Sequence, residues 1–321
     1  MTENRPGTGL SLTQKLRGHY RTLQPFLARS LNPIARPKTE RWAHEFDSDI
    51  GPVQLSGRFL PGSPDHLVVV IHGLGGITDS GYMALALAEA ERRDHSCLLL
   101  NCRGADRLGA DLYHSGLTRD IAEVLNSPRL ATYTTVDIFG YSIGGHIALK
   151  YCCGDLDARV RRVAAVGSPL DLRAAADDFD TAPFNVYRGH VLDALKEIYT
   201  AAYQRNPGGL TPLEARKIRT IRSWDDRIIA PRFGFDGADD YYEKMSVGPE
   251  LTRLNVDALY VGASCDPMVL ARSVRPYLGV SRLRHEWDPR GGHLGFDPKF
   301  DMGTGADLGL EPQVFSWFGE G

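Results

Sequence analysis

The chain of 321 residues is 42% hydrophobic and 24% charged and has a net charge of −3, the composition of an ordinary globular protein with a sizeable core. The lack of a basic surplus argues against a nucleic-acid partner, and no apolar run approaches the ~20 residues that a membrane span needs. Because the N-terminus lacks the apolar core of a signal peptide and the five cysteines form no Cys-x-x-Cys pair, we expect a cytoplasmic protein with reduced thiols.

Residues 1–40 are rich in proline, glycine and basic side chains, and Ser11 to Leu31 can form a helix. The apolar positions that recur on one face of this helix are Leu12, Leu16, Leu23, Phe26 and Leu27. A basic amphipathic helix can rest on a membrane surface, but it more often packs its apolar stripe on its own domain. We therefore expect residues 1–40 to pack on the core, and we do not favour peripheral membrane contact by residues 11–31.

The following stretches predict a sheet. Arg41 to Phe46 and Val53 to Leu60 read as two antiparallel edge strands with a turn near residues 48–51. Leu67 to Ile71 is an unbroken apolar run, as expected of a parallel strand that is buried on both faces. The elements predicted next are helices at 80–93 and 117–126 and strands at 97–101, 136–139 and 160–166. Alternation of strands and helices predicts an α/β fold with a mostly parallel, doubly wound sheet.

Between residues 171 and 254 this alternation stops, and helix-like pieces alternate with stretches rich in aromatic residues. The elements predicted from here on are helices at 191–203, 213–222 and 311–318 and strands at 257–262 and 283–287. We therefore expect a core of residues 41–170 and 255–321 and an inserted helical cap of residues 171–254. About half of the large aromatic side chains of the cap should line an acyl pocket, and the rest should form its own core.

The stretch Val136–Leu149 has the pattern of a strand, a one-residue corner and a helix, with Ser142 at the corner. Its Gly140-x-Ser142-x-Gly144 matches a nucleophile elbow, in which a strained turn raises the serine hydroxyl above the sheet. Glycines are needed two residues on either side because side chains there would collide with the neighbouring strand and helix. Ser142 is therefore the predicted nucleophile.

A serine hydroxyl needs a base within hydrogen-bond reach and a third group that orients the base. His293 is the predicted base, because it lies in a loop just past the last strand. Two carboxylates compete for the third position, Asp266 after the penultimate strand and Asp171 after the strand before it. We favour Asp266, whose loop can reach that of His293, and we expect Asp171 to cap a helix.

The oxyanion of an acyl-transfer intermediate needs two backbone amides. One should come from Ile143, directly after the nucleophile, and the other from Leu74, in the glycine-rich loop that follows Leu67 to Ile71. We also expect His72, Gly73 and Tyr141, which flank these positions in the chain, to contact the substrate.

Tyr113-His114-Ser115-Gly116 contains a second serine beside a histidine. It has neither the elbow pattern nor a following helix, so we interpret it as a structural anchor of a loop. No set of His, Asp, Glu or Cys residues shows metal-ligand spacing, so no metal site is expected.

These motifs resemble the YheT-like branch of the α/β-hydrolase superfamily from about residue 18 to the end. The resemblance is carried by His72–Gly76, Asn101–Gly104, Tyr113–Gly116, Gly140–Gly145, Ser264–Pro267 and Gly291–Phe296, with Trp224–Pro231, Gly234–Phe235 and Asp239–Tyr242 in the insertion. The elbow is shared across the superfamily, whereas Tyr-His-Ser-Gly together with Asp-Asp-Tyr-Tyr is specific to this branch.

The resemblance implies an α/β-hydrolase fold and a carboxylic-ester hydrolase with Ser142, Asp266 and His293 as the triad and with no cofactor or metal. Members of the wider group act on short-chain esters, acylglycerols and phospholipids, so the implied partner is a small-molecule ester or lipid. Two alternatives stay open. One is an acyltransferase that uses an alcohol in place of water, and the other is a non-catalytic binding protein on a hydrolase fold.

Overall fold

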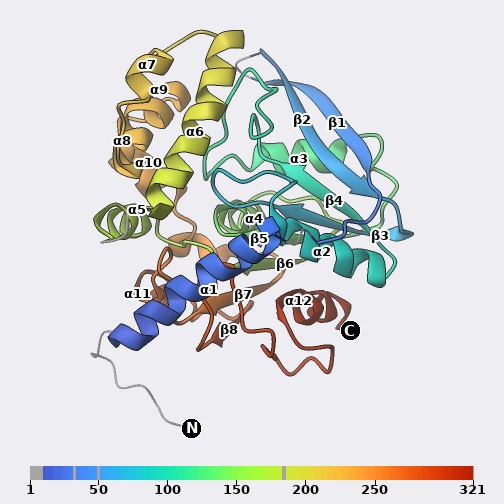
Figure 1. Cartoon of the computed structure of the whole chain (residues 1–321). Helices are drawn as coiled ribbons and strands as arrows, with labels where there is room; N and C mark the ends of the chain where they lie inside the picture. The colour runs from blue at the N-terminus through green and yellow to red at the C-terminus, as the bar shows by residue number, and fades with distance from the viewer. Residues whose placement is uncertain (1–9, 32–33, 49–50, 183–185, 321) are drawn as a thin grey trace.

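The computed structural model describes residues 10–31, 34–48, 51–182 and 186–320, and the side chains of residues 26–31 are outside this description. Eight strands form one sheet in the order β1-β2-β4-β3-β5-β6-β7-β8 (Figure 1). They are β1 (Glu40–Ser48), β2 (Gly51–Leu60), β3 (Ser63–Ile71), β4 (His95–Asn101), β5 (Thr135–Tyr141), β6 (Val160–Val166), β7 (Asp257–Ala263) and β8 (Leu283–Asp288). The pairs β1–β2 and β2–β4 are antiparallel and the other five pairs are parallel, which confirms the predicted fold class.

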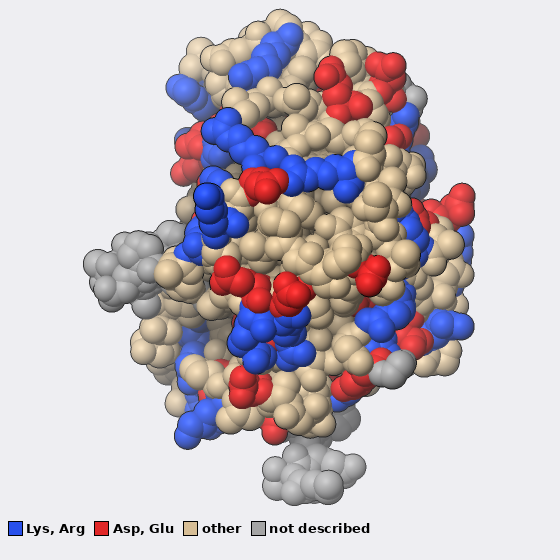
Figure 2. All heavy atoms as spheres, turned by 90° about the vertical axis from the view of Figure 1, so that its right-hand side faces the viewer, with Lys and Arg blue, Asp and Glu red and all other residues tan. Residues whose placement is uncertain are grey.

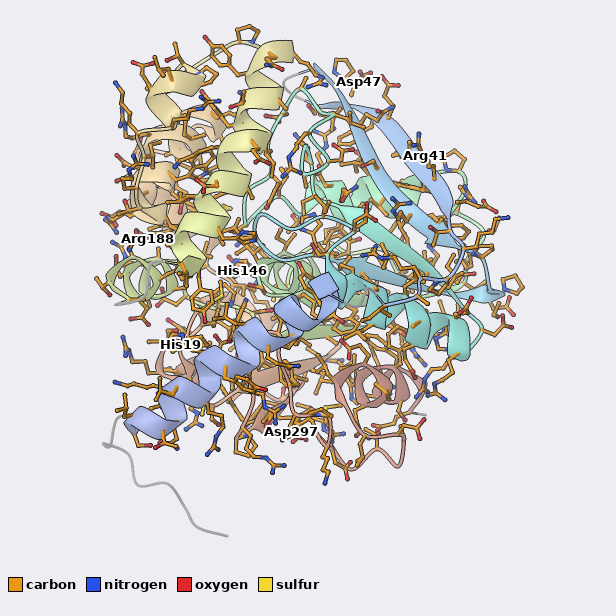
Figure 3. The ribbon with its side chains drawn as sticks, viewed as in Figure 1. His19, Arg41, Asp47, His146, Arg188 and Asp297 are labelled. Atoms are coloured by element: carbon orange, nitrogen blue, oxygen red, sulfur yellow. The ribbon has the colours of Figure 1, made fainter. Side chains whose placement is uncertain are left out.

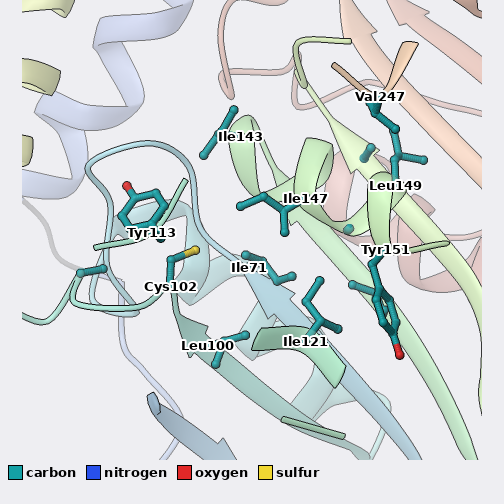
Figure 4. Close-up of a cluster of buried hydrophobic side chains, with 14 of the residues drawn as sticks. Ile71, Leu100, Cys102, Tyr113, Ile121, Ile143, Ile147, Leu149, Tyr151 and Val247 are labelled. Carbon is teal, nitrogen blue, oxygen red and sulfur yellow. The ribbon is translucent and has the colours of Figure 1, made fainter. Parts of the chain in front are cut away.

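Helices cover both faces of this sheet. The α-helices before the insertion are α1 (Leu12–Leu31), α2 (Gly81–Arg92), α3 (Arg119–Asn126) and α4 (Ile143–Cys152), and those after it are α11 (Ala271–Val274) and α12 (Leu310–Gly319). Alternate residues of Leu67–Ile71 in β3 belong to two different core clusters. On one face, Ile71 lies in the same cluster as Ile121 of α3 and Ile147 of α4 (Figure 4), and the other face is covered by α2 and α12. Burial on both faces explains why this strand is apolar throughout.

Three predicted elements differ from the structure, and the turn predicted near residues 48–51 lies partly outside the described residues. The helix predicted at 191–203 is longer at both ends and runs from Val186 to Arg205. β3 begins at Ser63 and not at Leu67, because Ser63 pairs with His95 of β4. A register shift separates this pair from those that begin at Leu67. The single helix predicted over 213–222 is wrong, because the chain forms two short helices, α7 (Pro212–Ala215) and α8 (Ile221–Trp224). Thr220 is extended and its hydroxyl accepts a hydrogen bond from the Ser223 amide, so a new helix begins there.

Within the described residues, 171–254 contribute helices and no strands. Besides α7 and α8 these are α5 (Leu172–Thr181), α6 (Val186–Arg205), α9 (Ala230–Phe233), α10 (Ala238–Met245), a π-helix η1 (Asp225–Ile229) and a 3₁₀-helix η2 (Gly248–Arg253); a second 3₁₀-helix, η3 (Arg275–Tyr277), follows α11. Helices α5 to α10 stand together on one side of the sheet in Figure 1.

Buried polar contacts tie this insertion to the core. Asp111 pairs with Arg103 of the core at 3.0 Å and with Arg232 of α9. His146 of α4 is fully buried, with its ring nitrogens 2.8 and 2.9 Å from the carbonyl oxygens of Pro169 and Met245 (Figure 3). Burial lowers the pKa of His146 to about 4, so this ring is neutral and its single N–H donates to only one of the two carbonyl oxygens. The buried ring lies between α4 and the end of α10.

Helix α1 contacts the core closely at Gly18 and Thr22 and not at Leu12 and Leu16 of the predicted apolar stripe. A Cβ atom on Gly18 would lie 1.8 Å from the carbonyl oxygen of Cys265, so the two backbones touch. Leu12 and Leu16, expected to be buried, are 73% and 56% exposed, and the side chains of Phe26 and Leu27 lie outside the described residues. The expectation that this stripe packs on the domain is therefore wrong for Leu12 and Leu16, whereas Leu23 lines the cavity described below.

The face of the molecule seen in Figure 2 carries Lys and Arg intermixed with Asp and Glu, without a patch of one sign. No helix among the described residues is long and apolar enough to cross a membrane.

Candidate active site

Ser142 stands at the corner between β5 and α4 with φ 52° and ψ −123°, a conformation that is rare for a residue other than glycine. A Cβ on Gly140 would lie 2.3 Å from backbone atoms of Gly145, and one on Gly144 would lie 2.5 Å from the carbonyl oxygens of Ile71 and His72. These contacts are those expected of the elbow glycines. The sequence pattern Gly-x-Ser-x-Gly therefore occurs here in the strand–turn–helix geometry that strains the serine.

Asp266 and His293 lie together at the carboxyl ends of β7 and β8. The Nδ1 atom of His293 is 2.8 Å from Oδ2 of Asp266, and both side chains are buried. The other carboxylate oxygen of Asp266, Oδ1, accepts hydrogen bonds from the amides of Met268 and Val269 at 2.7 and 2.9 Å. Because this pair occupies Nδ1 of His293, the second ring nitrogen, Nε2, is left to exchange a proton with another group.

The competing carboxylate, Asp171, has a different position. It caps α5, where its Oδ1 accepts from the Ala174 amide at 2.9 Å, and its Oδ2 accepts from the Tyr277 hydroxyl at 3.0 Å. The expectation that Asp171 caps a helix is thus confirmed.

The loop after β3 holds its amides in fixed directions. The Gly73 amide donates to the Tyr82 hydroxyl at 3.0 Å, and the Gly75 amide donates to the Tyr113 hydroxyl at 2.8 Å. Neither the Leu74 amide nor the Ile143 amide at the first turn of α4 has an acceptor among the described residues. Both amides that were predicted to bind an oxyanion are therefore available to do so.

His72 does not contact the cavity, and its predicted role in substrate binding needs correction. Its Nε2 accepts from the Cys102 amide at 3.1 Å, so the proton is on Nδ1, which donates to the Gly73 carbonyl oxygen at 2.8 Å. Burial lowers the pKa of His72 to about 4 and keeps the ring neutral. Since the carbonyl of Gly73 and the amide of Leu74 point in opposite directions across one peptide plane, His72 orients the Leu74 N–H.

The predicted contact of Tyr141 with substrate is also wrong. Strand alternation turns its ring to the sheet face covered by α2 and α12, where it is fully buried and donates to Oε1 of Glu311 at 2.9 Å. Gly73 does line the cavity, and a Cβ placed on it would lie 3.1 Å from Cβ of Ser142.

Helix α1 supplies a contact to the His293 loop that sequence reasoning missed. The Thr22 hydroxyl accepts from the His293 amide at 2.9 Å and donates to the Gly18 carbonyl oxygen at 2.8 Å. Cβ atoms on Gly292 and Gly295 would lie 2.3 Å and 1.8 Å from carbonyl oxygens of α1. No local sequence pattern signals this contact, because Thr22 and His293 lie 271 residues apart in the chain.

A cavity of about 750 Å³ joins these groups, a size typical of small-molecule sites. Ser142, Ile143, Leu74 and His293 line it from the core. The insertion contributes a largely apolar wall that includes Leu172, Phe179, Tyr187, Val191, Trp224, Ile229, Tyr241 and Tyr242. Ser142 and His293 therefore open into a space suited to an apolar ligand.

Asp225, at the start of the π-helix η1, is a carboxyl group in this wall that the sequence analysis did not single out. Its Oδ2 accepts from the Tyr242 hydroxyl at 2.8 Å, and burial raises the pKa of Asp225 to about 7. It is therefore partly protonated at neutral pH.

Ser115 and His114 form a loop anchor, as predicted. The Tyr241 hydroxyl accepts from the Ser115 amide at 2.9 Å and donates to the Ser115 hydroxyl at 2.8 Å, while Nδ1 of His114 accepts from the Gly116 amide at 3.1 Å. These contacts join the core loop to α10. No group of three or more His, Cys, Asp or Glu side chains in the described part of the chain could hold a metal ion.

A mostly parallel sheet, a strained serine at a strand-to-helix corner and an acid–histidine pair at the same sheet edge define the α/β-hydrolase class. The chain belongs to this family, because the family model described as "alpha/beta hydrolase fold" matches residues 66–300.

Two of the curated proteins to which the chain is similar differ in how much of their length it spans. It is 28% identical to the putative esterase YheT of Escherichia coli, over 71% of this chain and 70% of that protein. It is 25% identical to a monoacylglycerol lipase of Saccharomyces cerevisiae, over 63% of this chain but only 48% of that enzyme. Among solved structures, the Pyrococcus furiosus esterase Pf2001 shares the fold, with a TM-score of 0.52 at 12% identity over 82% of this chain and 88% of that one.

Proposed function

We propose that this protein hydrolyses carboxylic esters through an acyl-enzyme, with Ser142 as nucleophile, His293 as general base and acid, and Asp266 as the group that orients His293. The observation that carries the proposal is the His293–Asp266 pair, 2.8 Å apart, opening into the same cavity as the strained Ser142. The names of the relatives, an esterase and a monoacylglycerol lipase, support the same reaction class.

In the proposed reaction, Oγ of Ser142 attacks the acyl carbon while Nε2 of His293 takes its proton. His293 then gives this proton to the departing alcohol, and the acyl group stays on Ser142. Water attacks the acyl-enzyme in the same way and releases the acid. Asp266 holds the Nδ1–H of His293 throughout, which keeps Nε2 free to accept.

The amides of Leu74 and Ile143 bind the oxyanion of both tetrahedral intermediates. Each such donor is worth roughly 3 kcal/mol in the barrier. His72, Tyr82 and Tyr113 position the Leu74 loop through the hydrogen bonds described above, so no reorganisation is needed when the charge develops.

The insertion acts as a cap that binds the acyl chain of the substrate. Five of its aromatic side chains line the cavity, Phe179, Tyr187, Trp224, Tyr241 and Tyr242, and others, such as Tyr199, pack within the insertion. A wall of this kind favours an apolar acyl chain over a charged substrate.

Labelling with a fluorophosphonate tests the reaction class directly. A covalent adduct on Ser142, mapped by mass spectrometry, is expected, together with the release of p-nitrophenol from p-nitrophenyl esters. The proposal would be wrong if the protein formed no covalent adduct with the reagent and released no p-nitrophenol from any p-nitrophenyl ester. It would then be a non-catalytic member of the family.

The cap makes a prediction about acyl length. Each CH₂ group buried in the cavity contributes at most ~0.8 kcal/mol, so kcat/KM should rise several-fold per pair of carbons from acetyl to medium-chain p-nitrophenyl esters and then fall. Ala175→Phe, which adds bulk at a lining position on α5, should move the optimum to shorter chains, whereas its non-lining neighbour, Ala174→Phe, should not. A flat profile, or a steady preference for acetate, would contradict the role of the cap.

Thr22 predicts a second effect on catalysis. Thr22→Val removes the hydroxyl that accepts the hydrogen bond from the His293 amide. Because His293 is then held less firmly, kcat should fall by about 10- to 100-fold. Thr22→Ser keeps the hydroxyl and should restore most of kcat. Thr200→Val is the matched control, because Thr200 also donates to a carbonyl one helical turn earlier, at 2.7 Å, but lies on α6. Equal rates for Thr22→Val and Thr200→Val would show that Thr22 positions nothing.

A further inference from the structure

Helix α1 carries an exposed apolar ridge on the side away from Gly18 and Thr22. Leu12, Leu16, Tyr20 and Leu23 are 73%, 56%, 63% and 38% exposed, which is half of the eight exposed large hydrophobic side chains found among the described residues. At 3.6 residues per turn these four positions fall within an arc of about 80°. A contiguous apolar strip on one helix is unlike the singly scattered apolar residues of an ordinary protein surface.

The opposite side of the same helix is already occupied. Gly18 and Thr22 contact the loops that carry Asp266 and His293, and Arg21 pairs with Asp297 at 3.3 Å (Figure 3 labels Asp297 below α1). In Figure 1, α1 runs across the front of the molecule. The helix is thus held in place by its inner face, and its ridge is a built surface feature of the folded protein.

The charge around the ridge is positive. Residues 10–39 contain six Lys or Arg and no Asp or Glu, and two of the six, Arg21 and Arg36, pair with Asp297 and Asp79. On the helix, Lys15 and Arg17 lie about 60° to either side of the ridge at 3.6 residues per turn. Neither forms an ion pair with another described residue. A strip of apolar side chains between unpaired cations complements a surface with anionic headgroups and apolar chains.

The ridge leads to the entrance of the cavity. Leu23 lines the cavity, and so does Val186, the first residue of α6, which is 62% exposed. His19 of α1 joins these two elements, since its Nδ1 lies 3.0 Å from the hydroxyl of Tyr187. An apolar molecule that leaves a lipid surface beneath α1 would meet apolar side chains up to the cavity that holds Ser142.

We propose that α1 docks the protein on an anionic lipid surface through the ridge Leu12–Leu16–Tyr20–Leu23, with Lys15 and Arg17 against the headgroups. The surface then delivers its ester substrate to the adjacent cavity. The delivery step rests on the proposed function, whereas the docking step does not.

Flotation of the full-length protein with vesicles tests the docking. Wild type should bind phosphatidylcholine vesicles that contain 30% phosphatidylglycerol, at least tenfold more strongly than vesicles of phosphatidylcholine alone. Leu12→Ser/Leu16→Ser/Tyr20→Ser should lower binding at least tenfold, and so should Lys15→Glu/Arg17→Glu on the anionic vesicles. The control, Leu108→Ser/Leu213→Ser, removes two leucines that are 65% and 69% exposed elsewhere and should bind like wild type.

Hydrolysis of soluble p-nitrophenyl acetate should be the same in wild type, the ridge variant and the leucine control, because each substituted side chain is more than half exposed and none lines the cavity. Arg17 lies near Cys265, so Lys15→Glu/Arg17→Glu is compared by vesicle binding alone. Hydrolysis of an ester embedded in anionic vesicles should fall with binding. Because vesicle binding is measured without turnover, its result tests the docking of α1 independently of the role of Ser142. Absence of vesicle binding by wild type, or unchanged binding by the ridge variant, would overturn the proposal. A wild-type dimer that the ridge substitutions convert to a monomer, without vesicle binding, would assign the ridge to a second copy of the chain and would equally overturn it.

Discussion

Ser142→Ala should abolish ester hydrolysis, with a loss of at least about 10⁴-fold in kcat. The substitution removes the attacking oxygen and adds no atom, and alanine has the same Cβ as serine at φ 52°, so the strain at the corner is unchanged. The folded structure should therefore persist. The rate of p-nitrophenol release at saturating ester and the circular dichroism spectrum measure the two parts of this expectation.

Ser115→Ala is the matched control for this experiment. Ser115 also lines the cavity and also lies beside a histidine, but its hydroxyl is bonded to Tyr241. Fluorophosphonate labelling should be lost in Ser142→Ala and kept in Ser115→Ala. If Ser142→Ala retained even a tenth of the activity, the nucleophile would have to be sought elsewhere.

Asp266→Asn should cost about 10⁴-fold in kcat, the loss that the same change causes in serine proteases. The structure gives the reason. Oδ1 of Asp266 is held by the amides of Met268 and Val269, so the asparagine oxygen must stay there and its NH₂ group must face Nδ1 of His293. This NH₂ group donates to Nδ1 and moves the imidazole proton to Nε2, which can then no longer accept the proton of Ser142.

Asp171→Asn provides the comparison, because asparagine caps a helix about as well as aspartate does. The Ala174 amide and the Tyr277 hydroxyl lie next to Asp171, and neither is part of the proposed reaction. Its kcat should stay within a few-fold of wild type. A larger loss in Asp171→Asn than in Asp266→Asn would reverse the assignment of the acid.

Local sequence patterns were sufficient to predict the fold class, the elbow around Ser142 and the capping role of Asp171. The elbow around Ser142 could be recognised because its glycines are required by contacts within one strand, one corner and one helix. The class of the fold followed from the alternation of strands and helices, which reflects burial on both faces of the sheet. The role of Asp171 at the start of a helix could also be predicted locally, because a capping side chain bonds to an amide three residues away.

Which face of an element points to the site could not be read from the sequence. Tyr141 precedes the nucleophile but turns to the opposite side of the sheet, and His72 bonds to the Cys102 amide, 30 residues away. The inner side of α1 was decided by close backbone packing at Gly18 and by the hydroxyl of Thr22, which left the leucines outside. Amphipathic spacing predicts that a helix has an apolar face, but only the contacts between distant segments determine whether that face is buried. The tertiary structure alone therefore decided that the apolar side of α1 is exposed beside the cavity.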